Sequence, residues 1–124
     1  FQILNSMVHP EVFKRFDEWA EKQHSPYVIM ESAILFENSL QDCFDTIISI
    51  STPEEVVLQR VMLRDDCNKE QVLQRIRSQM PQEEKNTLAD YVILHDNMTM
   101  LLPQILSIHG DILKHCIKNE KRKN

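Results

Sequence analysis

The sequence predicts an α/β protein built around a parallel sheet. Three apolar segments typical of buried strands, residues 27–36, 45–51 and 89–94, are separated along the chain by segments with helical periodicity. Strands that alternate with helices in this way form parallel sheets. The length of 124 residues is that of one domain with a core of its own.

The first two predicted elements are a helix and a buried strand. Residues 9–23 place apolar side chains at every third or fourth position with charged residues between them, which is the pattern of an amphipathic helix. Pro10 fits the first turn of this helix, where its missing N–H is tolerated. The apolar run at 27–36 ends at Glu37, so we expect this carboxylate at the carboxyl edge of the sheet.

Three helices are predicted between the second and third strands. The segment Thr52–Glu55 has the composition of a helix start, with an N-cap threonine, a first-turn proline and two acids that favour the positive end of the helix dipole. That helix reaches Asp66. Asn68 then caps a second helix, and Pro81 opens a short charged helix that ends at Leu88.

The last part of the chain is predicted to hold one strand and one helix. The strand is residues 89–94, and residues 98–117 form the final helix, with a kink or a restart near Pro103. Residues 118–124 are charged and are predicted to be a disordered tail. Three strands are few for an independent parallel sheet, so the sequence indicates that the sheet is incomplete.

The composition excludes several classes of function. Gly110 is the single glycine, where average usage of about 7% gives roughly nine, so no glycine-rich phosphate loop can be built. The net charge of -5 offers no electrostatic case for nucleic acid or an anionic membrane. No apolar run approaches the ~20 residues of a membrane span. The three cysteines share no C-x-x-C spacing, which predicts reduced thiols and a cytoplasmic location.

Arginines are the strongest candidates for binding chemistry. Arg60 and Arg64 lie four residues apart on a predicted helix, so both guanidiniums are expected on one face. Two arginines on one face suit a polyphosphate, because each guanidinium binds phosphate oxygens bidentately and keeps its charge. The alternative is that these arginines form ordinary surface ion pairs with the acidic residues Asp65, Asp66 and Glu70.

Other candidates lie near predicted strand ends and at a helix start. Ligands of parallel sheets bind at the carboxyl ends of the strands, which favours Glu37, Ser51–Thr52 and the segment His95–Asn97. His9 precedes Pro10 at a predicted helix start, where a helix N-terminus favours an anionic group. A structural role as a cap, turn or surface residue is the alternative for each. The other histidines lack metal-ligand spacing, and no metal site is predicted.

The order of these motifs resembles that of a known family. The motifs are, in chain order, His9-Pro10, Ile34-Leu35-Phe36-Glu37, Asp45 before an apolar strand, Arg60-x-x-x-Arg64-Asp65, Arg75-Ile76-x-x-Gln79-Met80-Pro81-x-Glu83-Glu84-Lys85, and Ala89-Asp90-Tyr91-Val92-Ile93. From about Leu4 to His115 the chain resembles the C-terminal two-thirds of the dephospho-coenzyme A (dephospho-CoA) kinase family.

The resemblance implies a fold and a reaction. The family is similar in fold to the nucleoside monophosphate kinases, with a P-loop core, a parallel sheet and a helical lid. It transfers the γ-phosphoryl group of ATP to the ribose 3′-hydroxyl of dephospho-CoA, which is the final step of coenzyme A biosynthesis. ATP, Mg²⁺ and dephospho-CoA are therefore the expected ligands. A closing lid excludes water and brings cations to the phosphoryl-transfer transition state.

The resemblance also divides the chain into regions and assigns residues to them. Residues 1–24 correspond to the end of the acceptor-binding region, 25–59 to core strands and a helix, 60–88 to the lid, and 89–117 to a core strand and the C-terminal helix. By position, the implied residues are His9, Leu35, Phe36 and Glu37 for substrate binding, Arg60 and Arg64 for catalytic phosphate contacts, and Arg75, His95 and Asn97 for ATP binding.

The matched segment does not include the whole family pattern. The family's P-loop, its Mg²⁺ ligands and its catalytic base lie N-terminal to the match. We therefore expect an incomplete sheet that an upstream segment or oligomer contacts complete, and a chain that is not an active kinase by itself. Two alternatives stay open, namely another small-molecule P-loop kinase with the same lid, and a non-catalytic α/β binding module.

Overall fold

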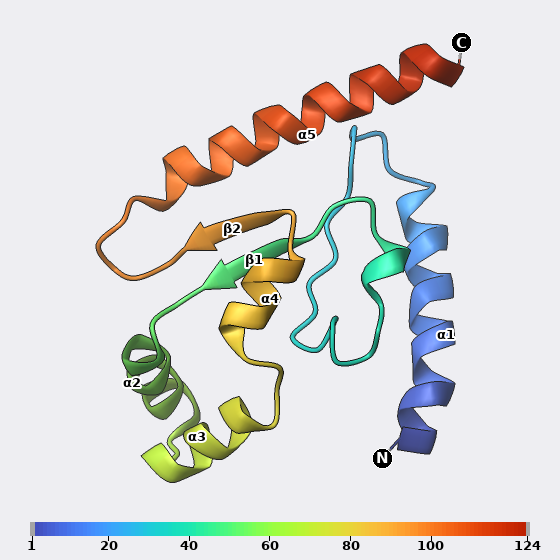
Figure 1. The fold of residues 1–124 in the computed structure, drawn as a ribbon. Coiled ribbons are helices and arrows are strands. Elements are labelled where there is room, and N and C mark those ends of the chain that lie inside the picture. Colours follow the sequence, from blue (N-terminus) through green and yellow to red (C-terminus); the bar gives the residue numbers. More distant parts are fainter. Residues whose placement is uncertain (1, 124) are drawn as a thin grey trace. The chain divides into compact units, whose positions relative to one another are not determined.

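The computed structural model describes residues 2–123, with side chains described for residues 10–122 (Figure 1). The chain separates into two compact units. One unit runs up to Glu31 and resumes at Leu113, and the other is Ser32–Ile112. The second unit contains the sheet and every predicted site residue except His9.

Two parallel strands form the sheet, β1 (Ile48–Ser51) and β2 (Tyr91–Leu94). Both were predicted, and both are shorter than their apolar runs. The strand predicted at 27–36 is wrong: residues 27–32 lie outside any strand, and residues 33–39 form a turn. A strand needs a hydrogen-bonded neighbour, and no described segment pairs with this run. An apolar sequence of the right composition is therefore not sufficient to form one.

The two faces of the sheet are covered to different extents. Residues paired in register share a face, so Ile50 of β1 and Ile93 of β2 lie on the same side. Ile93 is 9% exposed whereas Ile50 is 58% exposed, so the packing on this face extends over β2 but not over β1. Ser49 lies on the opposite face, where it is buried and bonded to α4 (Gln82–Leu88).

The N-cap of the helix after β1 lies one residue later than predicted. In α2 (Glu54–Asp65) the N-cap position is Pro53, with no side-chain cap bond, and not Thr52. The reason is the backbone of Pro53, whose carbonyl accepts from the Val56 and Val57 amides and so occupies the N-cap position itself.

A short turn joins α2 to α3 (Lys69–Arg77). Asp66 ends α2 in the left-handed region, with φ of 48°. Asn68 caps α3 as predicted, because its side chain accepts from the Gln71 amide while the Gln71 side chain accepts from the Asn68 amide. Val72 of α3 is 1% exposed, which makes it the most buried apolar side chain in the described part of the chain.

The last two helices flank β2. Pro81 is the N-cap of α4, which ends at Leu88 as predicted. The C-terminal helix, α5 (Leu101–Lys123), begins later than predicted, so Pro103 falls in its first turn, where its missing N–H costs no bond. The helix also continues through the segment predicted to be a disordered tail. Lysine, arginine and glutamate are good helix formers, and no glycine or proline interrupts them there.

In the first unit, α1 (Gln2–Ala20) begins before the predicted start at residue 9, so Pro10 lies inside the helix and not in its first turn. An interior proline removes one backbone hydrogen bond and costs about 3 kcal/mol, which is why the pattern favoured a later start. The helix nevertheless extends to both sides of Pro10. No helix in residues 2–123 is both long enough and apolar enough to cross a membrane.

Candidate functional site

An arginine and two loop residues meet at the carboxyl edge of the sheet. The His95 amide donates to the Ser51 carbonyl over 2.8 Å, which extends the strand pairing by one bond. The Arg60 guanidinium on α2 lies against the His95 ring, with Nη1 3.2 Å from Nδ1 and Nη2 3.3 Å from Nε2. It also donates to Asn97 Oδ1. The structure therefore brings three of the predicted phosphate-binding and ATP-binding residues together.

The loop that carries these contacts is held by its own hydrogen bonds. Asp96 accepts from the Met98 amide (3.0 Å) and from the amide (2.7 Å) and hydroxyl (3.0 Å) of Thr99. These bonds lower the pKa of Asp96 from its usual range; the bond from the Thr99 amide has the largest effect and that from the Met98 amide the next largest. Asn97 has a φ of 67°, a left-handed conformation that asparagine tolerates better than most residues.

Arg60 has no carboxylate partner among the described residues. Its contacts are an imidazole and an amide, and none of the ion pairs in the described part of the chain includes it. Its positive charge is half-buried and is not neutralised by a carboxylate. A cation of this kind, at the carboxyl edge of a parallel sheet, is suited to bind an anionic group such as a phosphate.

Arg64 does not share the partners of Arg60, although the sequence predicts that the two face one way. Arg64 donates to Asp65 through Nε (2.7 Å) and Nη2 (3.1 Å), and Arg75 of α3 donates to the same carboxylate over 2.6 Å. These bonds lower the pKa of Asp65 to about 2, and the bond from Arg64 has the larger effect. The alternative stated from the sequence was that the arginines form ion pairs with nearby acidic residues. Arg64 and Arg75 do form such pairs, with Asp65 and not with Asp66 or Glu70.

Glu37 is not at a strand end as predicted, because the strand before it does not form. Its Oε1 accepts from Lys85 Nζ (2.8 Å) and from the Met80 amide (2.9 Å). Lys85 also donates to the Ala33 carbonyl over 3.2 Å. Burial raises the pKa of Glu37, but the bonds from Lys85 and the backbone outweigh it, so the net pKa is lowered. These bonds therefore tie the turn at 33–39 to α4, through Lys85, and to the segment before α4, through Met80.

A second polar cluster was missed in the sequence. Gln82 and Asn86 of α4 are bonded to each other (2.8 Å) and to the Ser49 hydroxyl (2.9 and 2.8 Å), and Asn86 donates to the Ser51 hydroxyl over 3.2 Å. The cluster anchors α4 to β1. Its signal was present, since two amides lie at i and i+4 on one helix and two serines alternate in an otherwise apolar strand.

The remaining predicted residues are placed as follows. Leu35 and Phe36 are half-buried in the turn at 33–39, where their carbonyls accept from Leu40 and Ser39. His9 lies in α1, but its side chain is outside the described residues. No group of three or more histidine, cysteine, aspartate or glutamate residues in the described part of the chain is arranged to hold a metal ion.

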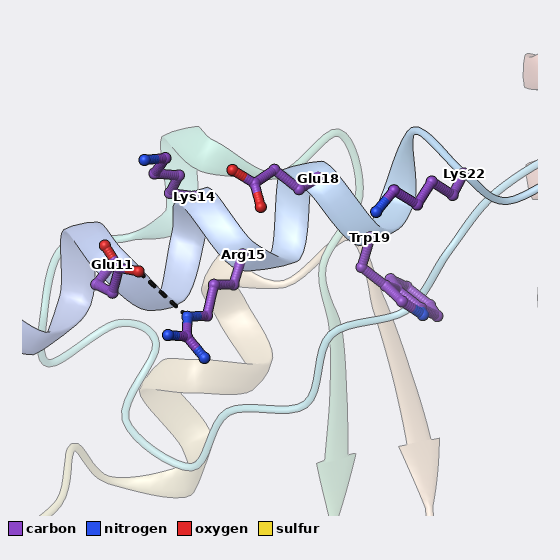
Figure 2. Close-up of a pocket in the computed structure, with 6 residues that line it drawn as sticks. All are labelled: Glu11, Lys14, Arg15, Glu18, Trp19 and Lys22. Carbon is purple, nitrogen blue, oxygen red and sulfur yellow. Dashed lines mark hydrogen bonds and ion pairs between the residues drawn. The ribbon is translucent and has the colours of Figure 1, made fainter.

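A shallow hollow on α1 lies in the other unit and contains no predicted site residue (Figure 2). Arg15 Nε donates to Glu11 Oε1 over 3.1 Å along its floor, and both side chains are well exposed. Trp19, which is 49% exposed, closes one end. Because α1 supplies every lining residue except Lys22, which lies in the turn directly after it, we interpret the hollow as a solvated, charged face at the end of α1. The residues that line it are Glu11, Lys14, Arg15, Glu18, Trp19 and Lys22.

Comparison with known proteins decides between the candidate families. Residues 1–100 match the family model described as dephospho-CoA kinase. The chain belongs to the dephospho-CoA kinase family. A dephospho-CoA kinase of Bacteroides fragilis (strain YCH46) is 41% identical over 106 residues, which are 85% of this chain and 52% of that protein. One from Acinetobacter baylyi is 33% identical over 113 residues, 90% of this chain and 58% of that protein.

A solved structure supports the fold of this dephospho-CoA kinase family member. A crystal structure of a Thermus thermophilus protein superposes with a TM-score of 0.72 at 30% identity and covers 98% of this chain and 58% of that protein. The α/β fold with a parallel sheet, expected from the resemblance, is thereby confirmed. The chain spans a little over half the length of the curated relatives named above.

Proposed function

We propose that this chain supplies the acceptor-side and lid part of an ATP-dependent dephospho-CoA kinase, which phosphorylates the ribose 3′-hydroxyl of dephospho-CoA. The observation that carries the proposal is the family match over residues 1–100, together with relatives named dephospho-CoA kinase at 33–41% identity. We place the protein in the cytoplasm, and the three free cysteines support a reducing compartment.

The proposed role of Arg60 is to neutralise charge on the transferring phosphoryl group. Phosphoryl transfer depends mainly on positioning and on electrostatic stabilisation of a loose transition state. Arg60 supports this role because its half-buried charge has no carboxylate partner in the described residues, and because His95 and Asn97 hold the guanidinium from one side. His95 and Asn97 are proposed to lie next to the bound ATP.

The proposed acceptor side is the turn at 33–39. Leu35 and Phe36 provide apolar surface for dephospho-CoA. Glu37 supports them through its bonds to Lys85 and Met80, which hold the turn in place. His9 is proposed to contact the acceptor as well.

ATP is proposed to bind with Mg²⁺. The metal neutralises phosphate charge when it is bound. The described side chains, which form no metal-binding group, act on the phosphates through arginine instead. We propose that the Mg²⁺ ligands and the P-loop lie outside residues 10–122, in the part of the relatives' length that this chain does not span.

Product analysis tests the proposed function. The protein that carries this chain, expressed from its own coding sequence, is incubated with ATP, Mg²⁺ and dephospho-CoA, and the products are separated by liquid chromatography with mass detection. We expect coenzyme A and ADP in equal amounts, no inhibition by a nucleoside monophosphate, and no turnover by the isolated 124-residue chain. Transfer to a nucleoside monophosphate in place of dephospho-CoA, or no transfer at all, contradicts the proposal.

A further inference from the structure

Asp65 receives hydrogen bonds from two arginines on different helices. Its Oδ1 accepts from Arg64 Nε, and its Oδ2 accepts from Arg64 Nη2 and from Arg75 Nη1. The Asp65 side chain is 26% exposed, whereas those of Arg64 and Arg75 are 73% and 57% exposed. The carboxylate is thus contacted by both guanidiniums, and the guanidiniums themselves face solvent.

Both arginines keep unused donors in this arrangement. A guanidinium carries five N–H groups in a rigid fork. Arg64 uses its Nε side for Asp65 and leaves the Nη1 and Nη2 pair available, while Arg75 uses Nη1 and leaves the Nε and Nη2 pair. In the described residues neither arginine has another hydrogen-bond or ion-pair partner. Each therefore keeps one complete fork for a bidentate contact with phosphate oxygens.

The surrounding backbone fixes the distance between the two helices. The left-handed Asp66 reverses the chain directly after Asp65, and the capping box at Asn68 sets the start of α3. Val72, one turn before Arg75, is fully buried. The carboxylate therefore bridges two guanidiniums whose helices are already held together.

We propose that Asp65 is a positioning residue, which holds Arg64 and Arg75 side by side so that their free forks bind one polyphosphate chain. The proposal rests on the proposed function, because it takes the phosphates of ATP as the natural ligand. Two arginines bonded to one carboxylate lose part of their side-chain freedom before the ligand arrives, which lowers the entropic cost of binding. The pKa of Asp65, about 2, keeps this carboxylate charged throughout the neutral pH range.

The direction in which one substitution changes the affinity for an anion separates a positioning role from a purely electrostatic effect of the Asp65 charge. Asp65→Asn preserves the size of the side chain and removes its charge. If Asp65 were only a nearby negative charge, its removal would tighten anion binding. If Asp65 positions the arginines, we expect the Kd of inorganic tripolyphosphate for the 124-residue chain, measured by calorimetry, to rise about three- to tenfold.

Asp66→Asn is the matched control. It removes the same charge one residue away, at a left-handed position that asparagine tolerates, and Asp66 has no ion pair with an arginine in the described residues. We expect an unchanged or slightly lower Kd for this variant. Equal behaviour of the two variants, tighter binding by Asp65→Asn, or no binding of tripolyphosphate to the unsubstituted chain overturns the proposal.

Two further variants test whether Asp65 acts through the arginines. Asp65→Glu keeps a carboxylate and is expected to recover part of the lost affinity. In the background Arg64→Ala with Arg75→Ala, the change Asp65→Asn is expected to leave the Kd unaltered or to lower it, because the unpaired carboxylate then only repels the anion, and a further loss of affinity there contradicts the proposal. Circular dichroism confirms that each variant is folded.

The two proposals can fail separately. Tripolyphosphate binding measures the arginine pair without any phosphoryl transfer, so the positioning role stands if Asp65→Asn weakens binding even when no coenzyme A is formed. Conversely, the kinase proposal stands if coenzyme A is formed while Asp65→Asn binds tripolyphosphate more tightly. In an active enzyme, Asp65→Asn is expected to raise the KM for ATP more than it lowers kcat.

Discussion

At the scale of single residues, Arg60 differs from Arg64 and Arg75 in the chemistry of its partners. Arg64 and Arg75 share the single carboxylate of Asp65, whereas Arg60 contacts only an imidazole and an amide. An arginine without a counter-charge contributes its full charge to an anionic transition state. The four-residue spacing of Arg60 and Arg64 predicts their shared helix, but their different partners lie in other parts of the fold.

Arg60→Ala is expected to lower kcat for dephospho-CoA phosphorylation by about 100-fold. The physical reason is the loss of a charge that acts on the transferring group, so KM is expected to change less than kcat. Steady-state kinetics of the protein that carries this chain provides the measurement. Arg77→Ala is the control, because Arg77 is an exposed arginine at the end of α3 that has no hydrogen-bond or ion-pair partner among the described residues. A similar loss in both variants argues against a specific role for Arg60.

Glu37→Gln is expected to destabilise the chain by about 1–3 kcal/mol, because Lys85 keeps a largely buried charge without its counter-ion. The pKa of Glu37 is lowered in the folded state, so its contribution is present above the carboxyl pKa of the unfolded chain and is lost as the pH falls through the lowered folded value. Urea unfolding between pH 7 and the acid range measures both effects. The difference in stability between Glu37→Gln and the unsubstituted chain is expected to shrink as the solution becomes acidic.

Glu31→Gln is the control for that experiment, since Glu31 is an exposed carboxylate in an irregular segment. The double variant Glu37→Gln with Lys85→Met gives the coupling between the partners. A loss of stability equal to the sum of the two single losses means that the ion pair does not stabilise the fold.

At the scale of elements, local signals predicted most helices well. Asn68 and Pro81 start α3 and α4 as expected, because a cap and a helix-starting proline act within one turn of their own position. The strand predicted at 27–36 failed for the opposite reason, since a strand depends on a neighbour that is distant in sequence. Pro10 shows a second limit, because a proline weakens a helix locally without deciding where it begins.

Asn68→Ala is expected to cost about 1 kcal/mol of stability, because it removes one half of the capping box and leaves the Gln71 amide without its partner. Urea denaturation monitored by circular dichroism measures the change. Lys69→Ala, at the next position in the same helix, is the control and is expected to be nearly neutral. An equally small effect of Asn68→Ala contradicts a stabilising role for the cap.

At the scale of the whole molecule, the core is small and uneven. The buried apolar side chains in the described part of the chain are Leu58, Val72, Ile93 and Ile108. All of them lie in the unit Ser32–Ile112, and they come from α2, α3, β2 and α5. Ile50, by contrast, is exposed although it lies in a central apolar run. The same residue type therefore contributes very differently to stability at two paired positions of one sheet.

Ile93→Val is expected to destabilise the chain by about 1 kcal/mol, and Ile50→Val by only a few tenths of a kcal/mol. The two variants are matched in chemistry and in register, and they differ only in exposure, 9% against 58%. Chemical denaturation of both provides the comparison. Equal losses at the two positions contradict the uneven covering of the sheet.

The sequence by itself determined the α/β class, two of the three expected strands, the presence and order of the α-helices, and the order of motifs that the family match confirms. These features depend on residues within a few turns of one another, or on their order along the chain. Only the tertiary structure decided that Arg60 meets His95 and Asn97, that Asp65 joins Arg64 to Arg75, and that Glu37 pairs with Lys85. The reason is physical: side-chain partners far apart in sequence are chosen by the packing of whole elements, which no local pattern encodes.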